Sequence, residues 1–191
     1  MRKLMQAAAL ITVVAAPTAA AAQSSPPPGR TNPVIVEQLS DRASDALLTS
    51  IVTWLSTNFD LQPTMLLPKV KLASAAAMTQ RRYRTFLGTD GSSVSPSEAA
   101  LTTVAIYDQR ETTIYLPLDW TGQTPAELSV LVHEMVHHLQ NVAQTKFECP
   151  QAREQLAYAA QQRWLNLFGH TLQDEFQIDP FTLLVTTRCM H

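Results

Sequence analysis

The five residues from His133 to His137, in the order His-Glu-Met-Val-His, constrain this chain more than any other stretch. On an α-helix, side chains four positions apart lie on one face, so the imidazoles of His133 and His137 can reach a single metal ion. Glu134 follows the first histidine directly. There its carboxylate can act as a general base for a metal-activated water without binding the ion itself. The pattern therefore predicts a helix that carries two metal ligands and a catalytic carboxylate.

The flanking sequence supports a helix from about Pro125 to Gln144. Thr124 is a favourable N-cap, Pro125 suits the first helical position, and Glu127 can complete a capping box. Apolar residues then recur at spacings of three and four and form one face, made of Leu128, Leu131, Val132, Met135, Leu139 and Val142. The two histidines lie on a different, more polar face. A surface helix that carries two histidines by chance is the alternative.

A third metal ligand is expected downstream, because catalytic zinc usually has three protein ligands and one open position. The downstream residues with suitable side chains are Glu148, Glu154, His170, Asp174, Glu175 and His191. Glu154 is the best placed of these, since Cys149-Pro150 begins a second helical pattern with Glu154 in about its first turn. A loop of about five residues lets this helix pack back against the first, so that Glu154 can face the two histidines.

This arrangement resembles a known group of enzymes. A His-Glu-x-x-His motif followed 17 residues later by a helical glutamate is similar to the gluzincin metallopeptidases, of which thermolysin is the familiar type. The run from His133 to Leu165 also resembles small secreted bacterial gluzincin-like proteins, through Cys149-Pro150, Glu154, Ala157-Tyr158, Gln161 and Trp164-Leu165. The resemblance covers about residues 100–165. It implies that His133, His137 and Glu154 bind one zinc ion, with Glu134 as the catalytic base and a peptide or protein as the substrate.

The chain departs from the larger members of that group at two points. No aspartate follows Glu154 at Ala157 or Tyr158, and no downstream histidine takes the position that stabilises the oxyanion in thermolysin-like enzymes. Tyr158, one turn after Glu154, is a candidate oxyanion donor, although a phenol packed in the core is the favoured interpretation. His138 points about 100° away from His137, so we expect a supporting or surface role and no bond to the same ion.

A β-hairpin is predicted before the metal-binding helix. Residues 102–107 and 112–116 are rich in β-branched and aromatic side chains, and the polar residues 108–111 form the turn between them. In the family that this chain resembles, the first strand is a sheet edge that borders the cleft, where an extended peptide can add by main-chain hydrogen bonds. The implied substrate-binding residues are Val104, Ala105, Ile106 and Tyr107. An edge covered by neighbouring loops is the alternative.

The rest of the domain supplies the scaffold. Asn32-Pro33 is predicted to open a long amphipathic helix that runs to about Phe59, and Lys69–Ala73 is predicted to be a strand. A short helix over residues 74–84 ends in three arginines, for which a solvated helix end is favoured over an anion site: Arg81, Arg82 and Arg84. Residues 88–97 should form a loop, and residues 180–185 a last helix or a strand. The order predicts an α+β, reduced zincin-like fold, in which a small β-sheet of about three strands packs on the metal-binding helix and the ligand helix.

Residues 1–22 have the features of a secretory signal peptide. Arg2-Lys3 is a basic head, Leu10–Ala16 is an apolar core, and three alanines at positions 20–22 offer a cleavage site. The segment is short, rich in alanine and interrupted by Pro17, so a stable membrane span is not expected after export. The sequence therefore predicts an exported bacterial protein, either periplasmic or secreted.

The mature chain is predicted to be one domain. Residues 23–32 are rich in serine and proline and should form an extended linker before a single domain at 33–191. Without the two basic residues of the leader, 12 basic residues face 16 acidic ones, so the net charge is near −4. This charge gives no attraction to nucleic acid or to anionic membranes. In an exported protein, Cys149 and Cys189 most simply form a disulfide, and a zinc-ligand role for Cys149 is the alternative.

The sequence thus predicts a zinc metallopeptidase that hydrolyses peptide bonds with one zinc ion and with Glu134 as general base. One alternative is a zinc-stabilised binding module of the cell envelope with little or no catalysis, which the missing supporting residues motivate. Another is a metal-free envelope protein whose motif is accidental. The pattern specifies neither the peptide sequence that is cleaved nor an oligomeric state.

Overall fold

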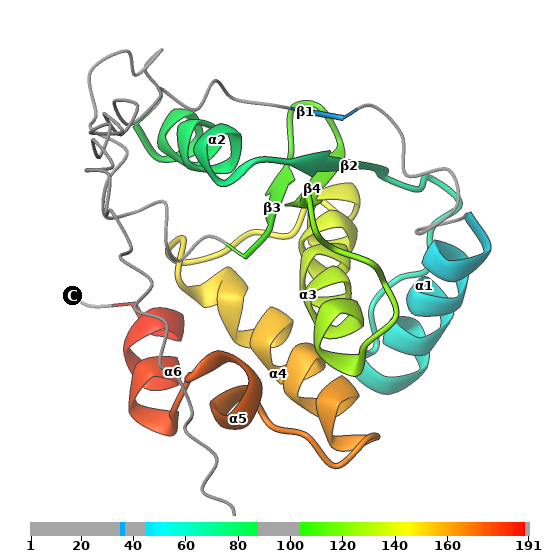
Figure 1. The fold of residues 1–191 in the computed structure, drawn as a ribbon. Helices are drawn as coiled ribbons and strands as arrows, with labels where there is room; N and C mark the ends of the chain where they lie inside the picture. Colours follow the sequence, from blue (N-terminus) through cyan, green and yellow to red (C-terminus); the bar gives the residue numbers. More distant parts are fainter. Residues whose placement is uncertain (1–34, 37–44, 88–103, 190–191) are drawn as a thin grey trace, which may run out of the picture. The chain divides into compact units, whose positions relative to one another are not determined.

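The structure of this chain is a computed structural model that describes residues 35–36, 45–87 and 104–189 (Figure 1). These residues belong to one compact unit. They form six helices and one sheet with the strand order β1-β2-β4-β3, which is a mixed α+β arrangement as predicted. The predicted signal peptide at 1–22, the linker at 23–32 and the loop at 88–97 lie outside the described residues.

The sheet is short and mixed. β1 (Ile35–Val36) pairs antiparallel with β2 (Lys69–Ala73), and β2 pairs parallel with β4 (Thr113–Pro117). β4 also pairs antiparallel with β3 (Ile106–Asp108), which ends the strand order. The three longer strands and the β3–β4 hairpin confirm the sequence prediction, and the two-residue β1 adds a fourth strand that was not expected.

β1 corrects the expected start of the first helix. The sequence predicts one helix from Asn32-Pro33 to Phe59, but Ile35–Val36 is a strand. The structure gives α1 as Asp45–Phe59, and residues 37–44 lie outside the described residues. Adjacent isoleucine and valine are stiff at χ1 and favour extended backbone, which here finds a partner in β2. The apolar period of the remaining helix is confirmed by its buried residues, Leu48, Ile51, Val52 and Leu55.

β3 also differs from its prediction. The expected strand covers residues 102–107, of which 102–103 lie outside the described residues. The structure gives the strand as Ile106–Asp108, with Val104 and Ala105 preceding it. The hairpin register would place Val104 opposite Pro117, which has no N–H to donate to the ladder. At the other end, Asp108 extends the strand because its main chain pairs with Thr113.

Helices cover both faces of the sheet (Figure 1). α2 (Ala75–Leu87) packs on one face, against Tyr115 of β4. On the other face, α1 and α3 (Pro125–Val142) form the main core with Ile114 and Leu116. Successive side chains of a strand point to opposite faces, and this alternation assigns Tyr115 to one helical layer and its two neighbours to the other.

The predicted arginine cluster at the end of α2 is not simply a solvated helix end. Arg81 Nη1 lies 3.2 Å from Asp108 Oδ2 and 2.9 Å from Glu111 Oε1. The Arg81 guanidinium also stacks on the Tyr115 ring, 4.0 Å from its centroid. Arg82 is exposed, and the side chain of Arg84 lies outside the described part. Arg81 therefore ties α2 to the β3–β4 hairpin, which is a structural role.

α3 and α4 (Ala152–Asn166) lie side by side below the sheet (Figure 1). α3 begins at the predicted capping box, where Thr124 Oγ1 accepts a hydrogen bond from Glu127 N and the Glu127 carboxylate accepts one from Thr124 N. It ends two residues before the predicted Gln144. The connection to α4, residues 143–151, is longer than the expected five residues, yet α4 still packs back along α3 as predicted.

The C-terminal segment is helical. α5 (Leu172–Phe176) is followed by α6 (Pro180–Thr187), which confirms the helical alternative for this segment. A disulfide joins Cys149 and Cys189, with their Cα atoms 5.8 Å apart. The disulfide confirms the predicted pairing and overturns a zinc-ligand role for Cys149. None of the helices in the described ranges is long and apolar enough to cross a lipid bilayer.

Candidate metal centre

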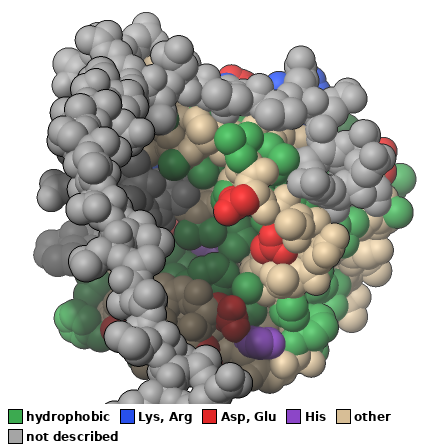
Figure 2. Space-filling model, viewed as in Figure 1, with side chains coloured by type: hydrophobic (Ala, Val, Ile, Leu, Met, Phe, Trp, Pro, Cys, Tyr) green, Lys and Arg blue, Asp and Glu red, His purple; other side chains and the backbone are tan. Residues whose placement is uncertain are grey.

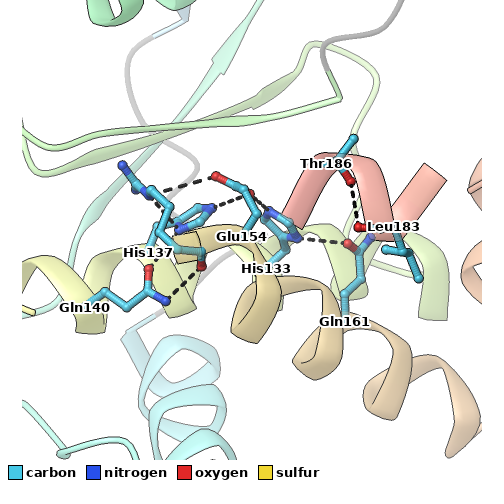
Figure 3. Close-up of polar contacts among 8 residues, drawn as sticks. His133, His137, Gln140, Glu154, Gln161, Leu183 and Thr186 are labelled. Atoms are coloured by element: carbon cyan, nitrogen blue, oxygen red, sulfur yellow. Dashed lines mark hydrogen bonds and ion pairs between the residues drawn. The ribbon is translucent and has the colours of Figure 1, made fainter. Parts of the chain in front are cut away.

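Two imidazoles of α3 and one carboxylate of α4 converge on one point (Figure 3). The Glu154 Oε2 atom lies 3.2 Å from His133 Nε2 and 3.2 Å from His137 Nε2. The ligand atoms of the three residues all lie within 4.8 Å of one another. A tetrahedral zinc ion with bonds of 2.0–2.2 Å places neighbouring ligand atoms about 3.4 Å apart. The three predicted ligands therefore form a group, here called the metal group, that can hold one metal ion.

Helix geometry and burial position the metal group. The two histidines are four residues apart, and their ring centroids lie 5.0 Å from each other on one face of α3. His133 is 9% exposed and His137 is 5% exposed. Glu154 is the third residue of α4, at the point where α4 begins to pack along α3. The two imidazoles are therefore largely shielded from water, whereas the Glu154 side chain is 30% exposed.

The electrostatics of the metal group fit a cation. Burial acts to lower the pKa of His133, but the hydrogen bond to Glu154 and the charge of Glu134 raise it above its ordinary value. Burial acts to raise the pKa of Glu154, yet hydrogen bonds from both imidazoles hold it well below its usual range. The Glu154 carboxylate is therefore charged, and positive charge on the imidazole side is favoured.

Gln161 of α4 fixes the ring of His133 (Figure 3). Its Oε1 atom lies 3.0 Å from His133 Nδ1. The amide is held in this orientation because its Nε2 group donates to Ser129 Oγ at 3.3 Å. With an acceptor facing Nδ1, that nitrogen carries the proton. The Nε2 atom of His133, which faces Glu154, is then the ring nitrogen left to bind a metal ion.

Gln140 fixes the ring of His137 in the same way. Its Oε1 atom lies 3.1 Å from His137 Nδ1, and its Nε2 group donates to the main-chain carbonyl of Arg153 at 3.0 Å. Arg153 Nε is also 3.4 Å from His137 Nδ1. We assign the Nδ1 proton to the shorter contact with Gln140, because the amide orientation is fixed on its far side. Both imidazoles therefore present Nε2 to the point at which a metal ion could be held.

Glu134 lies beside the metal group and is only 7% exposed. The negative charge of Glu134 acts to raise the pKa of both His133 and Tyr158. Within the described ranges, no hydrogen bond occupies its carboxylate. A buried carboxylate next to the two imidazoles of the metal group can accept a proton there.

Tyr158 packs on a ligand of the metal group. Its ring meets the His133 ring edge-to-face, with centroids 4.7 Å apart. Burial, together with the charges of Glu154 and Glu134, raises the pKa of the phenol, which is therefore protonated at neutral pH and can donate a hydrogen bond. The side chain is half-buried at the site, and its role as an oxyanion donor stays a prediction.

His138 belongs to a separate network. It is fully buried, so the surface alternative is wrong. Its Nε2 group donates to the Leu66 carbonyl, and its Nδ1 atom accepts from the Tyr107 hydroxyl at 3.2 Å. Asn141 Nδ2 donates to the same hydroxyl at 3.0 Å. Both ring nitrogens of His138 are thus engaged away from the metal group, and the network holds β3 against α3.

A family model described as "Domain of unknown function (DUF6647)" matches residues 40–191, which include the metal group and both cysteines. The chain belongs to the DUF6647 family. No curated protein and no solved structure matches the chain.

Two pockets lie along α3 of this DUF6647 protein, and His137 of the metal group lines the larger of these two. One, of about 450 Å³, lies at the end of α3 and includes His137, Arg153 and Gln109 in its lining. The other, of about 180 Å³, lies at the start of α3 and includes Val104 and Val130. Figure 2 shows a hollow in one face of the molecule, lined largely by hydrophobic side chains with histidine near its floor. Because Val104 precedes β3 and Gln109 follows it, the edge strand runs from one pocket to the other.

Sequence reasoning missed the residues that support the metal ligands in this family member. Gln140 follows His137 by three residues, and Gln161 follows Glu154 by seven, so each glutamine lies on the same helix face as a ligand. A search for polar residues at helical spacing from the ligands would have found both. Arg153 gave no such signal, because its contacts depend on how α4 packs on α3.

Proposed function

We propose that this protein is a zinc-dependent hydrolase of peptide bonds, of the gluzincin type. The observation that carries the proposal is the convergence of Glu154 Oε2, at 3.2 Å, on the Nε2 atoms of both histidines. Two imidazoles and one glutamate are the ligand set of catalytic zinc in thermolysin. The resemblance of the segment 100–165 to small gluzincin-like proteins supports the same assignment.

The number of ligands favours a catalytic site over a structural one. Structural zinc sites are usually closed by four protein ligands, whereas catalytic sites keep one position open. In the part of the chain that the structure describes, the metal group contains three ligands and no fourth. Both cysteines are committed to the disulfide and cannot complete the coordination. The open position is where a substrate carbonyl or a water molecule can bind.

Each residue of the site has a role in peptide hydrolysis. A zinc ion in such a site supplies Lewis acidity, which polarises a carbonyl group and makes water a stronger acid. The Glu134 carboxylate accepts the proton of the attacking water and delivers it to the leaving amine. The Tyr158 hydroxyl donates a hydrogen bond to the oxyanion that develops on the scissile carbonyl. An extended substrate binds along the main chain of β3.

A zinc-stabilised binding module without catalysis is the second candidate. It is favoured by the neutral amides of Gln140 and Gln161, which stand where many catalytic zinc sites have carboxylates. A carboxylate partner raises the basicity of a ligand imidazole more than a neutral amide does. This candidate predicts one bound zinc ion and no cleavage.

The substitution Glu134→Gln separates the two candidates. We expect the zinc-loaded wild-type protein to cleave a diverse peptide mixture, measured by mass spectrometry. The Glu134→Gln variant should bind the same one equivalent of zinc and lose at least about 10²-fold in rate, because it lacks the base. Zinc-loaded wild type that cleaves nothing would favour the binding module, and an unchanged rate in the variant would remove Glu134 from the mechanism.

Less than about a tenth of an equivalent of zinc after gentle purification would favour a metal-free protein.

The disulfide supports an exported location, because disulfides persist in oxidising compartments. We propose that the protein acts in the periplasm or outside the cell after removal of the leader at 1–22. Expression of the full chain in a bacterium, followed by fractionation and N-terminal mass analysis, tests this. A full-length protein in the cytosolic fraction would contradict it.

A further inference from the structure

We infer that the pocket beside His137 is a carboxylate-binding subsite in which Arg153 recognises an acidic group of the substrate. This inference deepens the proposed function and rests on it. The hydrolase would then prefer peptides that carry a carboxylate close to the scissile bond, either on an acidic side chain or at a free C-terminus.

The pocket adjoins the metal group directly. It has a volume of about 450 Å³, and His137 and Arg153 both line it. Arg153 Nε lies 3.4 Å from His137 Nδ1, so the guanidinium stands behind one of the ligand imidazoles. A group bound by Arg153 is therefore near the reacting bond. Lys146 adds a second positive charge to the lining, and the exposed Glu148 adds a negative one.

The charge balance around Arg153 calls for an anion. The one carboxylate within ion-pair distance of Arg153, in the described ranges, is Glu154, whose Oε1 atom is 3.9 Å from Arg153 Nε. Glu154 is also a ligand of the metal group. A divalent ion with two neutral imidazoles and one carboxylate carries a net positive charge, so Arg153 then faces a charge of its own sign. A substrate carboxylate in the pocket offsets both positive charges.

Arg153 is held in place at the wall of the pocket. Its main-chain carbonyl accepts the hydrogen bond from Gln140. With the Gln109 amide turned so that its oxygen faces the guanidinium, that oxygen accepts from Arg153 Nη1 at 2.6 Å and from Nη2 at 3.3 Å. The guanidinium has five donors, so others are left for a carboxylate. A fixed arginine loses little entropy on binding, which favours recognition.

The edge strand leads a substrate to this pocket. Tyr107 of β3 contacts His138 and Asn141 of α3, so the strand lies along the helix that carries the metal ligands. Gln109 follows the strand and lines the pocket. A peptide extended along β3 advances about 3.3 Å per residue. The preferred carboxylate should therefore lie within a few residues of the scissile bond.

Binding to the zinc-loaded Glu134→Gln protein tests the inference without turnover. The probes are blocked hexapeptide amides in which glutamate replaces glutamine at each position in turn, the all-glutamine parent amide, and that parent with a free C-terminal carboxylate. We expect at least one carboxylate peptide to bind about tenfold more tightly than the parent amide in calorimetry, as a charge-assisted hydrogen bond allows. Adding Arg153→Gln should abolish the preference. Adding Arg163→Gln, which removes the same charge ten residues along α4, should leave it intact.

The outcomes separate this inference from the proposed function. Equal binding of the parent amide and every carboxylate peptide, or a preference that survives Arg153→Gln, overturns the inference, even where the wild type hydrolyses peptides. Selective binding with no cleavage by the wild type leaves the inference standing and defeats the hydrolase. A preference confined to the free-acid peptide identifies the C-terminal carboxylate as the ligand. If the Arg153→Gln protein binds no zinc, the Arg153→Lys protein is tested in its place. With zinc retained, Arg153→Lys should keep a weaker preference for the carboxylate peptides over the parent amide. Full loss of that preference would contradict the inference.

Discussion

The amide of Gln161 holds His133 through a hydrogen bond of 3.0 Å, and Ser129 holds the amide in turn. This chain of contacts fixes which ring nitrogen carries the proton. It also keeps Nε2 aimed at Glu154, 3.2 Å away. At the scale of single residues, the orientation of the candidate metal ligands therefore depends on neutral side chains that do not themselves bind the ion.

Gln161→Ala should weaken zinc binding about 10–100-fold, because the variant no longer fixes the orientation and tautomer of His133. Competition against a chromophoric chelator measures the change. Gln155→Ala is the matched control, since Gln155 lies on an exposed part of the same helix. Gln161→Glu should bind zinc at least as tightly as the wild type, because a carboxylate raises imidazole basicity. Equal affinity in Gln161→Ala and the control would show that Gln161 does not position the ligand.

At the element scale, α3 depends on the carboxylate of Glu127. This carboxylate accepts hydrogen bonds from the main chain of Thr121 at 2.6 Å and of Thr124 at 3.1 Å, and also from both threonine hydroxyls. Burial acts to raise the pKa of Glu127, but these hydrogen bonds from Thr121 and Thr124 lower it to about 2. α3, which carries two residues of the metal group, therefore begins at a carboxylate that is charged in the folded protein over a wide pH range.

The low pKa of Glu127 predicts a pH-dependent contribution to stability. A carboxyl group whose pKa is lower in the folded state stabilises the fold above its unfolded value of 4.5, and that stabilisation is lost as the pH falls towards about 2. Glu127→Gln should therefore cost about 1–2 kcal/mol at pH 7, and the difference from wild type should shrink below pH 4.5. Urea denaturation over this range measures it. Asp119→Asn, which removes a carboxylate that makes none of these hydrogen bonds, is the control. A constant difference at every pH would contradict the assignment.

Elements that depend on neighbouring residues in the sequence could be predicted, and elements that depend on distant partners could not. The capping box of α3 and the strand Lys69–Ala73 were predicted from local sequence, and both are confirmed. β1 was missed because its two residues are stabilised by pairing with Leu72 and Ala73, far along the chain. The same reason explains which site residues could be predicted. The spacing of the two histidines within α3 is a local signal, whereas Arg153 acquires its partners only when α4 packs on α3.

At the scale of the whole molecule, the disulfide connects the C-terminal end of the described chain to the start of the ligand helix. Cys149 lies five residues before Glu154, and Cys189 follows α6. Replacing both cysteines by serine removes a bridge between residues 40 apart and should cost about 4 kcal/mol on the loop-entropy model. The free energy of unfolding should fall accordingly in urea denaturation, and zinc affinity should fall with it. A reductant should destabilise the wild type and leave the double variant unchanged. Equal sensitivity of both proteins would show that the reductant acts elsewhere.

Zinc binding should couple the metal group to the stability of the entire domain. The unfolded chain does not bring His133, His137 and Glu154 together, because Glu154 lies on a different helix from the histidines. An ion that binds only the folded state at about 1,000 times its Kd stabilises that state by about 4 kcal/mol. For a domain of this size, 1 kcal/mol shifts the Tm by about 2–4 °C, so zinc should raise the Tm by roughly 8–16 °C.

Thermal unfolding with zinc and with a chelator measures this shift, and two histidine variants locate its origin. His133→Ala should abolish the shift, since it removes a ligand. His170→Ala should preserve it, because His170 pairs with Glu175 at 2.6 Å beside α5 and has no place in the metal group. Glu134→Gln should also keep the shift, because a general base is not needed to hold the ion. A zinc-dependent shift of equal size in His133→Ala would mean that the stabilising ion binds somewhere other than between α3 and α4.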